Sequence, residues 1–218
     1  MSQLTGLLGG SFNPGHGGHR RITLFAMDAL GLDEAWWLVS PGNPLKQKAG
    51  MAPLDARLKS AEAISRRAPI VPTAIELHLD TRYTIDTLRK LKRRYPKRKF
   101  VWLMGSDNLA QFHRWKGWRA IARTMPIAVI ARPGYNAQAM TSPAMAWLRR
   151  YRVSAARFRK RGYKGLGSAP ALVFMRFDPD PRSATAIRRA NADWASQFRG
   201  AAARDRLTFR RIQSREEA

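Results

Sequence analysis

Short apolar runs alternate along the chain with segments in which apolar residues recur at helical spacing. Residues 19–30 form the first such helical segment, which ends at Gly31 and carries on one side Ile22, Phe25, Ala26, Ala29 and Leu30. The apolar runs predict strands over residues 1–8, 34–40, 70–75, 99–104, 126–131 and 171–177. Further helices are expected from Pro53 to Ile64, from Thr84 (as the cap) to Pro96, and after Arg182. This alternation predicts an α/β fold with a doubly wound, Rossmann-like parallel sheet.

Such sheets bind ligands outside the carboxyl ends of their strands, where the strand order reverses. Polar, glycine-rich segments follow the predicted first, second, fourth and sixth strands. We therefore expect these segments to gather at one edge of the sheet.

The loop after the first predicted strand reads Gly9-Gly10-Ser11-Phe12-Asn13-Pro14-Gly15-His16-Gly17-Gly18-His19. Its glycines let the backbone pass close to a ligand, and the N–H groups of a helix start favour anions. His16 and His19, spaced three residues apart at a helix start, share one face. Imidazole donors in this setting suit a polyphosphate that gains charge during reaction, so the loop indicates nucleotide chemistry.

Alternatively, the two imidazoles could supply half of the ligands of a zinc site. The chain has four histidines and no cysteine, which makes a His/Cys zinc site the weaker reading, and we predict no protein-held metal. Neither the dinucleotide-binding G-x-G-x-x-G pattern nor the P-loop pattern is present at this turn.

A second polar segment, residues 182–188, follows the last predicted strand. Ser183 can cap the helix that begins there, and Arg188, about one turn later, can point at the same anion site as the free N–H groups. A purely structural helix cap is the alternative.

Length and composition limit the remaining choices. At 218 residues the chain suits one domain, which we place over residues 1–196, with a mobile tail over residues 197–218. The lack of cysteine, of a signal segment and of a membrane-length apolar run predicts a cytoplasmic protein without a membrane partner. The composition leaves a homo-oligomer open.

The formal net charge of +25 predicts attraction for polyanions, although solvated basic faces also account for it. Eight basic and no acidic residues lie between Arg149 and Lys164, in a basic connection that we extend over residues 149–170. Aromatic residues interleave there, as in single-strand-binding proteins. No known nucleic-acid motif appears, so a nucleic-acid-binding module is the weaker alternative.

The first loop resembles the G-x-F-x-P-x-H-x-G-H signature of the HxGH nucleotidyltransferase superfamily, and residues 182–188 resemble its I-S-x-T-x-I-R signature, with Arg182 in place of the usual isoleucine. Residues 82–88, 105–109, 112–115 and 131–134 are similar to the Y-T, G-x-D-x-L, F-x-x-W and R-P-G segments of bacterial nicotinate-nucleotide adenylyltransferases. Pantetheine-phosphate adenylyltransferases lack the Y-T and F-x-x-W pieces. They remain an alternative, as do nicotinamide-mononucleotide adenylyltransferases.

The resemblance implies roles for particular residues. Its catalytic set is His16, His19 and Arg188. Its ATP-binding set is Gly10, Ser11, Phe12, His16, His19, Gly105, Asp107, Arg132, Ser183 and Arg188. Its substrate-binding set is Lys46, Tyr83, Thr84, Trp115 and Lys116. Lys46 lies in Asn43-Pro44-Leu45-Lys46, which departs from the commoner P-P-H-[KR] pattern.

The implied reaction joins ATP and nicotinate mononucleotide to give deamido-NAD and pyrophosphate. The imidazoles would bind the triphosphate, Asp107 would contact the adenosine ribose, and Arg132 would border the adenosine pocket. Trp115 would stack on the nicotinate ring, and the backbone near Thr84 and Lys116 would bind its carboxylate. Mg²⁺ would be carried by the ATP phosphates, since this ion keeps its waters and takes few protein ligands.

Overall fold

The computed structural model describes residues 3–42, 50–131, 134, 136–165, 169–177, 183–198 and 203–212, with the backbone alone for 161–165. These residues form two compact units. The first unit comprises Met1–Leu8, Ile22–Ala35 and Tyr83–Pro179, and the second comprises Gly9–Arg21, Trp36–Arg82 and Asp180–Ala218. The single domain expected over residues 1–196 stays a prediction.

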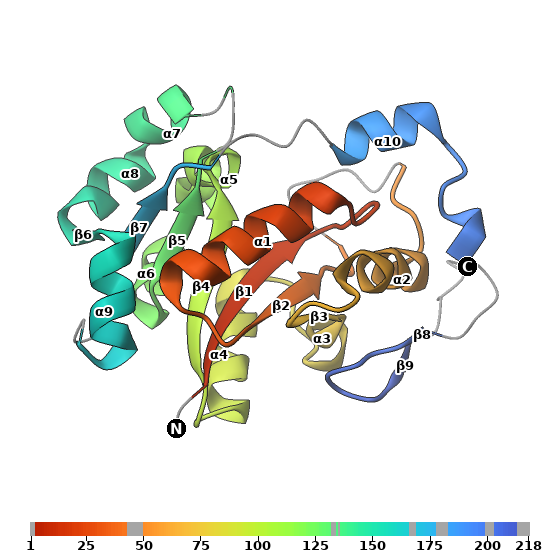
Figure 1. Cartoon of the computed structure of the whole chain (residues 1–218), viewed down its shortest axis with the longest axis horizontal. Helices are drawn as coiled ribbons and strands as arrows, with labels where there is room; N and C mark the ends of the chain where they lie inside the picture. Colours follow the sequence, from red (N-terminus) through yellow and green to blue (C-terminus); the bar gives the residue numbers. More distant parts are fainter. Residues whose placement is uncertain are drawn as a thin grey trace. The chain divides into compact units, whose positions relative to one another are not determined.

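The main sheet has seven strands in the order β3-β2-β1-β4-β5-β7-β6 (Figure 1). Its strands are β1 (Leu4–Gly10), β2 (Glu34–Val39), β3 (Ile70–Thr73), β4 (Lys99–Gly105), β5 (Ile127–Ile130), β6 (Arg152–Val153) and β7 (Leu172–Met175). The pairs β1–β4, β4–β5, β5–β7 and β6–β7 are parallel. The order runs from β1 outward to β3 on one side and from β4 outward on the other. This is the reversal of a doubly wound sheet, so the predicted fold class is confirmed.

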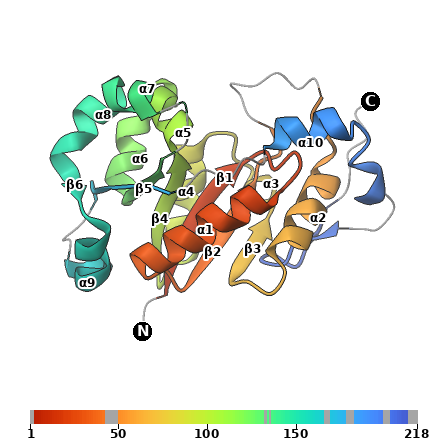
Figure 2. The same cartoon turned by 45° about the horizontal axis from the view of Figure 1, so that its top comes forward.

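Helices follow most of the strands, as the periodicity predicts (Figures 1 and 2). They are α1 (Gly17–Leu30), α2 (Leu54–Ser65), α3 (Ile75–His78), α4 (Thr84–Arg94), α5 (Ser106–Gln111), α6 (Trp118–Thr124), α7 (Asn136–Thr141), α8 (Pro143–Leu148), α9 (Ala155–Gly165) and α10 (Ala184–Ala190). Short 3₁₀ segments are η1 (Phe112–Arg114), η2 (Arg149–Tyr151) and η3 (Ser196–Phe198). Within the described residues, no helix combines the length and apolarity needed to cross a membrane.

The core of the first unit lies on the central strands. Every residue of β5 and all but the end residues of β4 are buried, as expected for strands covered on both faces. The second unit buries Trp36 to Val39 of β2 together with Leu58 of α2 and Ile70 of β3. Continuous apolar runs of this kind explain why these strands could be predicted from the sequence.

Three local predictions were wrong. Strand β1 continues to Gly10, so the first two glycines of the loop belong to the strand. Strand β3 ends at Thr73, and a short helix occupies residues 75–78. Thr84 does not cap its helix: Tyr83 is the N-cap residue, and its carbonyl accepts the N–H groups of Asp86 and Thr87 at 3.0 and 3.1 Å. Helix α4 ends before Pro96, as predicted.

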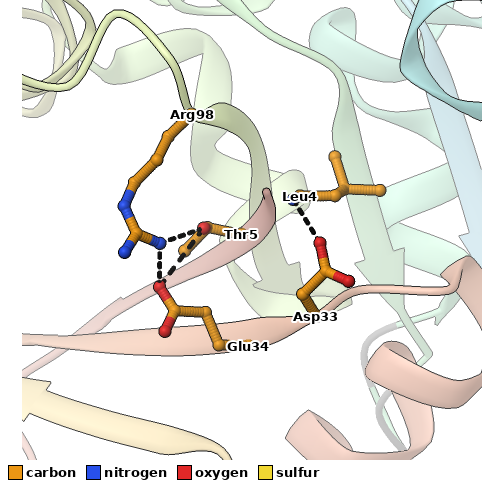
Figure 3. A network of polar contacts seen from close by, with 5 residues as sticks. All are labelled: Leu4, Thr5, Asp33, Glu34 and Arg98. Carbon is orange, nitrogen blue, oxygen red and sulfur yellow. Dashed lines mark hydrogen bonds and ion pairs between the residues drawn. The ribbon is translucent and has the colours of Figure 1, made fainter. Parts of the chain in front are cut away.

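A polar network fixes the amino-terminal ends of strands in the first unit (Figure 3). The Asp33 carboxylate accepts the backbone N–H of Leu4 at 2.6 Å. The Arg98 guanidinium, just before β4, forms an ion pair with Glu34 and donates to Thr5 Oγ1 at 3.1 Å. These contacts join the amino-terminal parts of β1 and β2 to the residue before β4, so we assign the network a structural role.

The basic connection contains the two-residue strand β6, which the sequence analysis missed, and helix α9. Phe158 is fully buried, and the Arg159 guanidinium donates to the carbonyl of Asp28 in the last turn of α1 at 2.7 Å. A cation stabilises a helix at this end because it donates hydrogen bonds to the last carbonyls and interacts favourably with the negative end of the helix dipole. Part of the basic stretch therefore packs on the first unit.

The segment expected to be a mobile tail contains an anchored hairpin of β8 (Ala203–Arg204) and β9 (Arg211–Ile212). The fully buried Asp205 carboxylate accepts the Thr73 hydroxyl at 2.8 Å and the Ala74 N–H at 2.6 Å. It also accepts the N–H groups of Leu207 and Thr208, both at 2.9 Å. One carboxylate thus fixes the turn of the hairpin and ties it to the end of β3.

We expect Asp205→Ala to lower the free energy of unfolding by about 2–4 kcal/mol, because it leaves the buried Ala74 N–H and Thr73 hydroxyl without an acceptor. Chemical denaturation measures the change. The matched control is Asp193→Ala, which removes an exposed carboxylate from the same part of the chain and should change stability by less than about 0.5 kcal/mol. Equal effects of the two variants would contradict the anchoring role.

Candidate active site

The two imidazoles of the first loop lie against each other in the second unit. The ring centroids of His16 and His19 are 3.9 Å apart, which confirms that the spacing places both rings on one face. Phe12 lies 4.8 Å from the His19 ring and is stacked on Trp37 at 5.1 Å. Phe12 and Trp37 are buried, so the imidazole pair packs on buried aromatic rings.

Backbone hydrogen bonds select the tautomer of both rings. Nδ1 of His16 accepts the N–H of Gly18 at 3.1 Å, and Nδ1 of His19 accepts the N–H of His16 at 3.3 Å. A nitrogen that accepts a hydrogen bond carries no proton, so the proton of each neutral ring is on Nε2. The loop therefore prepares two Nε2–H donors.

The first and last motifs meet in the second unit. The Arg188 guanidinium donates to the Asn13 carbonyl at 2.6 Å, across 175 residues of sequence, and to Thr185 Oγ1 at 3.4 Å. Ser183 caps α10 as predicted, since its hydroxyl accepts the Ala186 N–H at 3.1 Å. The segments after the first and last predicted strands, two of those expected to gather, therefore lie together.

Another group of predicted residues lies in the first unit, at the carboxyl end of β4. Gly105 is the N-cap residue of α5, and Asp107 stands in the first turn of this helix. A Cβ on Gly105 would collide with the Asp107 carboxylate, so a side chain at position 105 would displace it. Gly105 and Asp107, both in the implied ATP-binding set, are therefore close neighbours.

The start of α4 and the turn before α6 form a third group, also in the first unit. The Lys116 ammonium lies 4.2 Å from the centre of the Tyr83 ring and 4.0 Å from the Asp86 carboxylate. Trp115 makes edge-type contacts with Phe112 at 5.4 Å and Trp102 at 6.3 Å, and neither ring stacks face to face on it. Lys116 thus lies beside Tyr83 and Asp86 at the start of α4, whose first residue is Thr84.

Two predicted site residues, Lys46 and Arg132, lie outside the described residues. Among the residues that the structure does describe, no group of three or more His, Cys, Asp or Glu side chains is arranged to hold a metal ion.

Sequence reasoning missed the residues that hold the first loop in place. Asn13 is buried and binds the loop before α2, donating to the Gly50 carbonyl at 2.9 Å and accepting the Ala52 N–H at 3.2 Å. Arg57 and Ser60, on α2, contact the loop backbone. One signal was available: Arg57 follows Leu54 by three positions and precedes Ala61 by four, so a charged residue stands on the predicted apolar face.

Comparison with known proteins agrees with this site. A family model described as cytidylyltransferase-like matches residues 7–190, which include both motifs. A relative from Erythrobacter litoralis (strain HTCC2594), named "Probable nicotinate-nucleotide adenylyltransferase", is 68% identical over 208 residues, covering 95% of this chain and 94% of that protein. A relative of the same name from Ruegeria pomeroyi (strain ATCC 700808 / DSM 15171 / DSS-3) is 47% identical and covers 91% of each chain. The chain belongs to the cytidylyltransferase-like family and, within it, to the nicotinate-nucleotide adenylyltransferases.

Solved structures show the same fold. Plasmodium falciparum nicotinic acid mononucleotide adenylyltransferase complexed with NaAD aligns with a TM-score of 0.62 and 15% identity, covering 86% of this chain and 83% of that one. The complex of that protein with APC aligns with a TM-score of 0.60. At this identity the similarity concerns the fold alone.

We expect His19→Ala to lower kcat by about a hundredfold or more, the scale for losing one preorganised donor to developing charge. His19→Gln should retain more activity than His19→Asn, because an extended glutamine places its amide nitrogen near the position of Nε2 and asparagine places its own near Nδ1. Steady-state kinetics measure the three variants, and thermal unfolding checks their folding.

The control for this series is His78→Ala, which removes an imidazole from α3 and should leave kcat near wild type. Turnover of His19→Ala at the level of this control would remove His19 from the catalytic set. Equal activity of the Gln and Asn variants would contradict the assignment of Nε2 as the donor.

Proposed function

We propose that this chain transfers the adenylyl group of ATP to nicotinate mononucleotide, releasing pyrophosphate and forming deamido-NAD, a step of NAD biosynthesis. The observation that carries the proposal is the meeting of the two motifs: Arg188 binds the loop that presents His16 and His19. The family membership and the 68% identity to a relative named for this activity support it.

In the proposed complex the triphosphate lies on the first loop. Nε2–H of His16 and of His19 donate to phosphate oxygens, and Arg188 adds a fixed positive charge. The Ser183 hydroxyl oxygen accepts the Ala186 N–H, and the hydroxyl proton can donate to an anion. The backbone of Gly10, Ser11 and Phe12 borders the same site, and Lys46 is proposed to neutralise the remaining phosphate charge.

The adenosine and nicotinate ends are assigned to the other two groups of residues. We assign Asp107 and the backbone of Gly105 to the ribose of adenosine, and Arg132 to the border of the adenosine pocket. Trp115 stacks on the nicotinate ring, and backbone N–H groups near Tyr83, Thr84 and Lys116 bind its carboxylate, with the Lys116 ammonium close to Tyr83.

The chemistry needs no protein nucleophile and no general base. A phosphate oxygen of nicotinate mononucleotide, already ionised near neutral pH, forms a bond to the α-phosphorus of ATP. The bond from that phosphorus to the bridging oxygen of the β-phosphate breaks, and pyrophosphate leaves with the electron pair. Catalysis then consists of positioning and of stabilising negative charge, which the Nε2–H donors and Arg188 supply. Mg²⁺ carried by the triphosphate would neutralise further charge on the leaving group.

We expect nicotinate mononucleotide to be preferred over nicotinamide mononucleotide by at least about tenfold in kcat/KM. N–H donors satisfy both oxygens of a carboxylate, whereas an amide turns its NH₂ toward one donor and leaves it unpaired, at a cost of about 1–3 kcal/mol. A pyrophosphate-release assay with Mg-ATP measures the acid, the amide and phosphopantetheine side by side.

The three substrates separate the alternatives. Equal kcat/KM for acid and amide would contradict the acid specificity and leave adenylyl transfer standing. If only phosphopantetheine is turned over, it is the substrate in place of nicotinate mononucleotide. If none of the three substrates leads to pyrophosphate release, the proposed activity is refuted.

A further inference from the structure

Arg57, in the first half of α2, is buried and binds three backbone carbonyls. Its side chain is 2% exposed. Nη1 donates to the carbonyls of Ser11 at 2.8 Å and Ser40 at 2.7 Å, and Nε donates to the carbonyl of Ala52 at 2.8 Å. Burial lowers the pKa of Arg57 to about 10, an effect that Asp55 opposes, so the guanidinium remains a cation at neutral pH.

These bonds join the loops that follow two neighbouring strands. Ser11 follows β1, Ser40 follows β2, and the Ser40 N–H donates to the Gly10 carbonyl at 3.0 Å. A single guanidinium nitrogen therefore bridges the two loops next to the point where the backbone already joins them. The fixed fork of arginine suits such a bridge better than the point charge of lysine.

The bond to Ser11 determines which way the next peptide N–H points. In a planar trans peptide the C=O and the N–H point in opposite directions. Because the Ser11 carbonyl faces Arg57, the Phe12 N–H faces away from α2. Phe12 also has a φ of +47°, a left-handed conformation that costs about 1–2 kcal/mol in a residue with a Cβ and persists only where its surroundings hold it.

The same face of α2 holds the other end of the loop. The Gly15 N–H donates to Ser60 Oγ at 3.0 Å, and Ser60 in turn donates to the Arg57 carbonyl at 2.8 Å. A Cβ on Gly15 would lie 2.9 Å from the Cα of Ala61, so only glycine lets the loop approach this closely. Positions 57, 60 and 61 are one turn apart on the helix and therefore contact the loop together.

From this geometry we infer that Arg57 is a positioning residue for adenylyl transfer, which acts through the Ser11 carbonyl to hold the loop that presents His16 and His19. The inference rests on the proposed function. Arg57 touches neither imidazole in any contact described above, so its effect on the reaction passes through the loop backbone. Ser60 supports the loop at Gly15 in the same way.

The test is Arg57→Lys, which keeps the cation and loses the bridging fork. We expect kcat to fall by about tenfold to a hundredfold, the cost of misplacing catalytic groups by a fraction of an ångström to one ångström, with the melting temperature within a few degrees of wild type. The matched control is Arg66→Lys at the exposed C-cap of the same helix, which should behave as wild type.

A double-mutant cycle separates positioning from a general structural role. If Arg57 acts by placing His19, the loss of kcat caused by Arg57→Lys should largely disappear in a His19→Ala background. Two independent losses that multiply, or an unchanged kcat in Arg57→Lys, would overturn the inference. If Arg57→Lys does not fold, Ser60→Ala carries the same cycle, with an expected loss of a few fold.

A wrong proposed function would appear as a lack of turnover in the wild type, whereas a wrong inference about Arg57 would appear only in the comparison of variants. If the wild type does not turn over, titration calorimetry with a non-hydrolysable ATP analogue decides the inference by itself. Arg57→Lys should then weaken binding of the analogue by about tenfold relative to Arg66→Lys, since the Phe12 N–H and the imidazoles lose their fixed positions. Equal affinities of the two variants would overturn the inference.

Discussion

The close packing of the first loop on α2 is the contact on which the placement of His16 and His19 depends. The loop approaches the helix so closely that Gly15 touches the backbone of Ala61, and its ends are bound by Arg57 and Ser60. With the backbone fixed there, the Nδ1 atoms of both imidazoles receive backbone N–H groups and Nε2 carries the proton. A loop held only by its own sequence would lose this arrangement, because glycines give it no intrinsic preference for one conformation.

Burying the Arg57 cation costs free energy, so its presence on α2 calls for a physical reason. Hydrogen bonds to Ser11, Ser40 and Ala52 compensate the burial of Arg57, yet an apolar residue would fill the same face of α2 without that cost. The benefit is geometric: one guanidinium orients carbonyls on both loops. The guanidinium also adds positive charge next to the loop proposed to bind the triphosphate, which agrees in sign with the net charge of +25.

The sequence predicted those parts of the molecule that repeat a pattern or a motif. The central strands were predictable because they are continuously apolar, and the imidazole pair because its residue types are unusual for a turn. The edge strand β6 was missed because its two residues, Arg152 and Val153, do not form an apolar run. The hairpin at Asp205 was missed because a tertiary contact with Thr73 anchors it. Arg57 was missed for the same reason: hydrogen bonds to distant carbonyls leave no periodicity, although its place on an apolar face was visible.

The proposed reaction moves the α-phosphorus of ATP into the dinucleotide, and isotope labelling follows that atom. ATP labelled at the α-phosphorus is incubated with nicotinate mononucleotide, Mg²⁺ and the protein, and the products are separated. We expect all transferred label in the dinucleotide, in an amount equal to the pyrophosphate formed, and none in the pyrophosphate itself. Label recovered as AMP in place of the dinucleotide, or a labelled dinucleotide that forms equally well in His19→Ala, would contradict it.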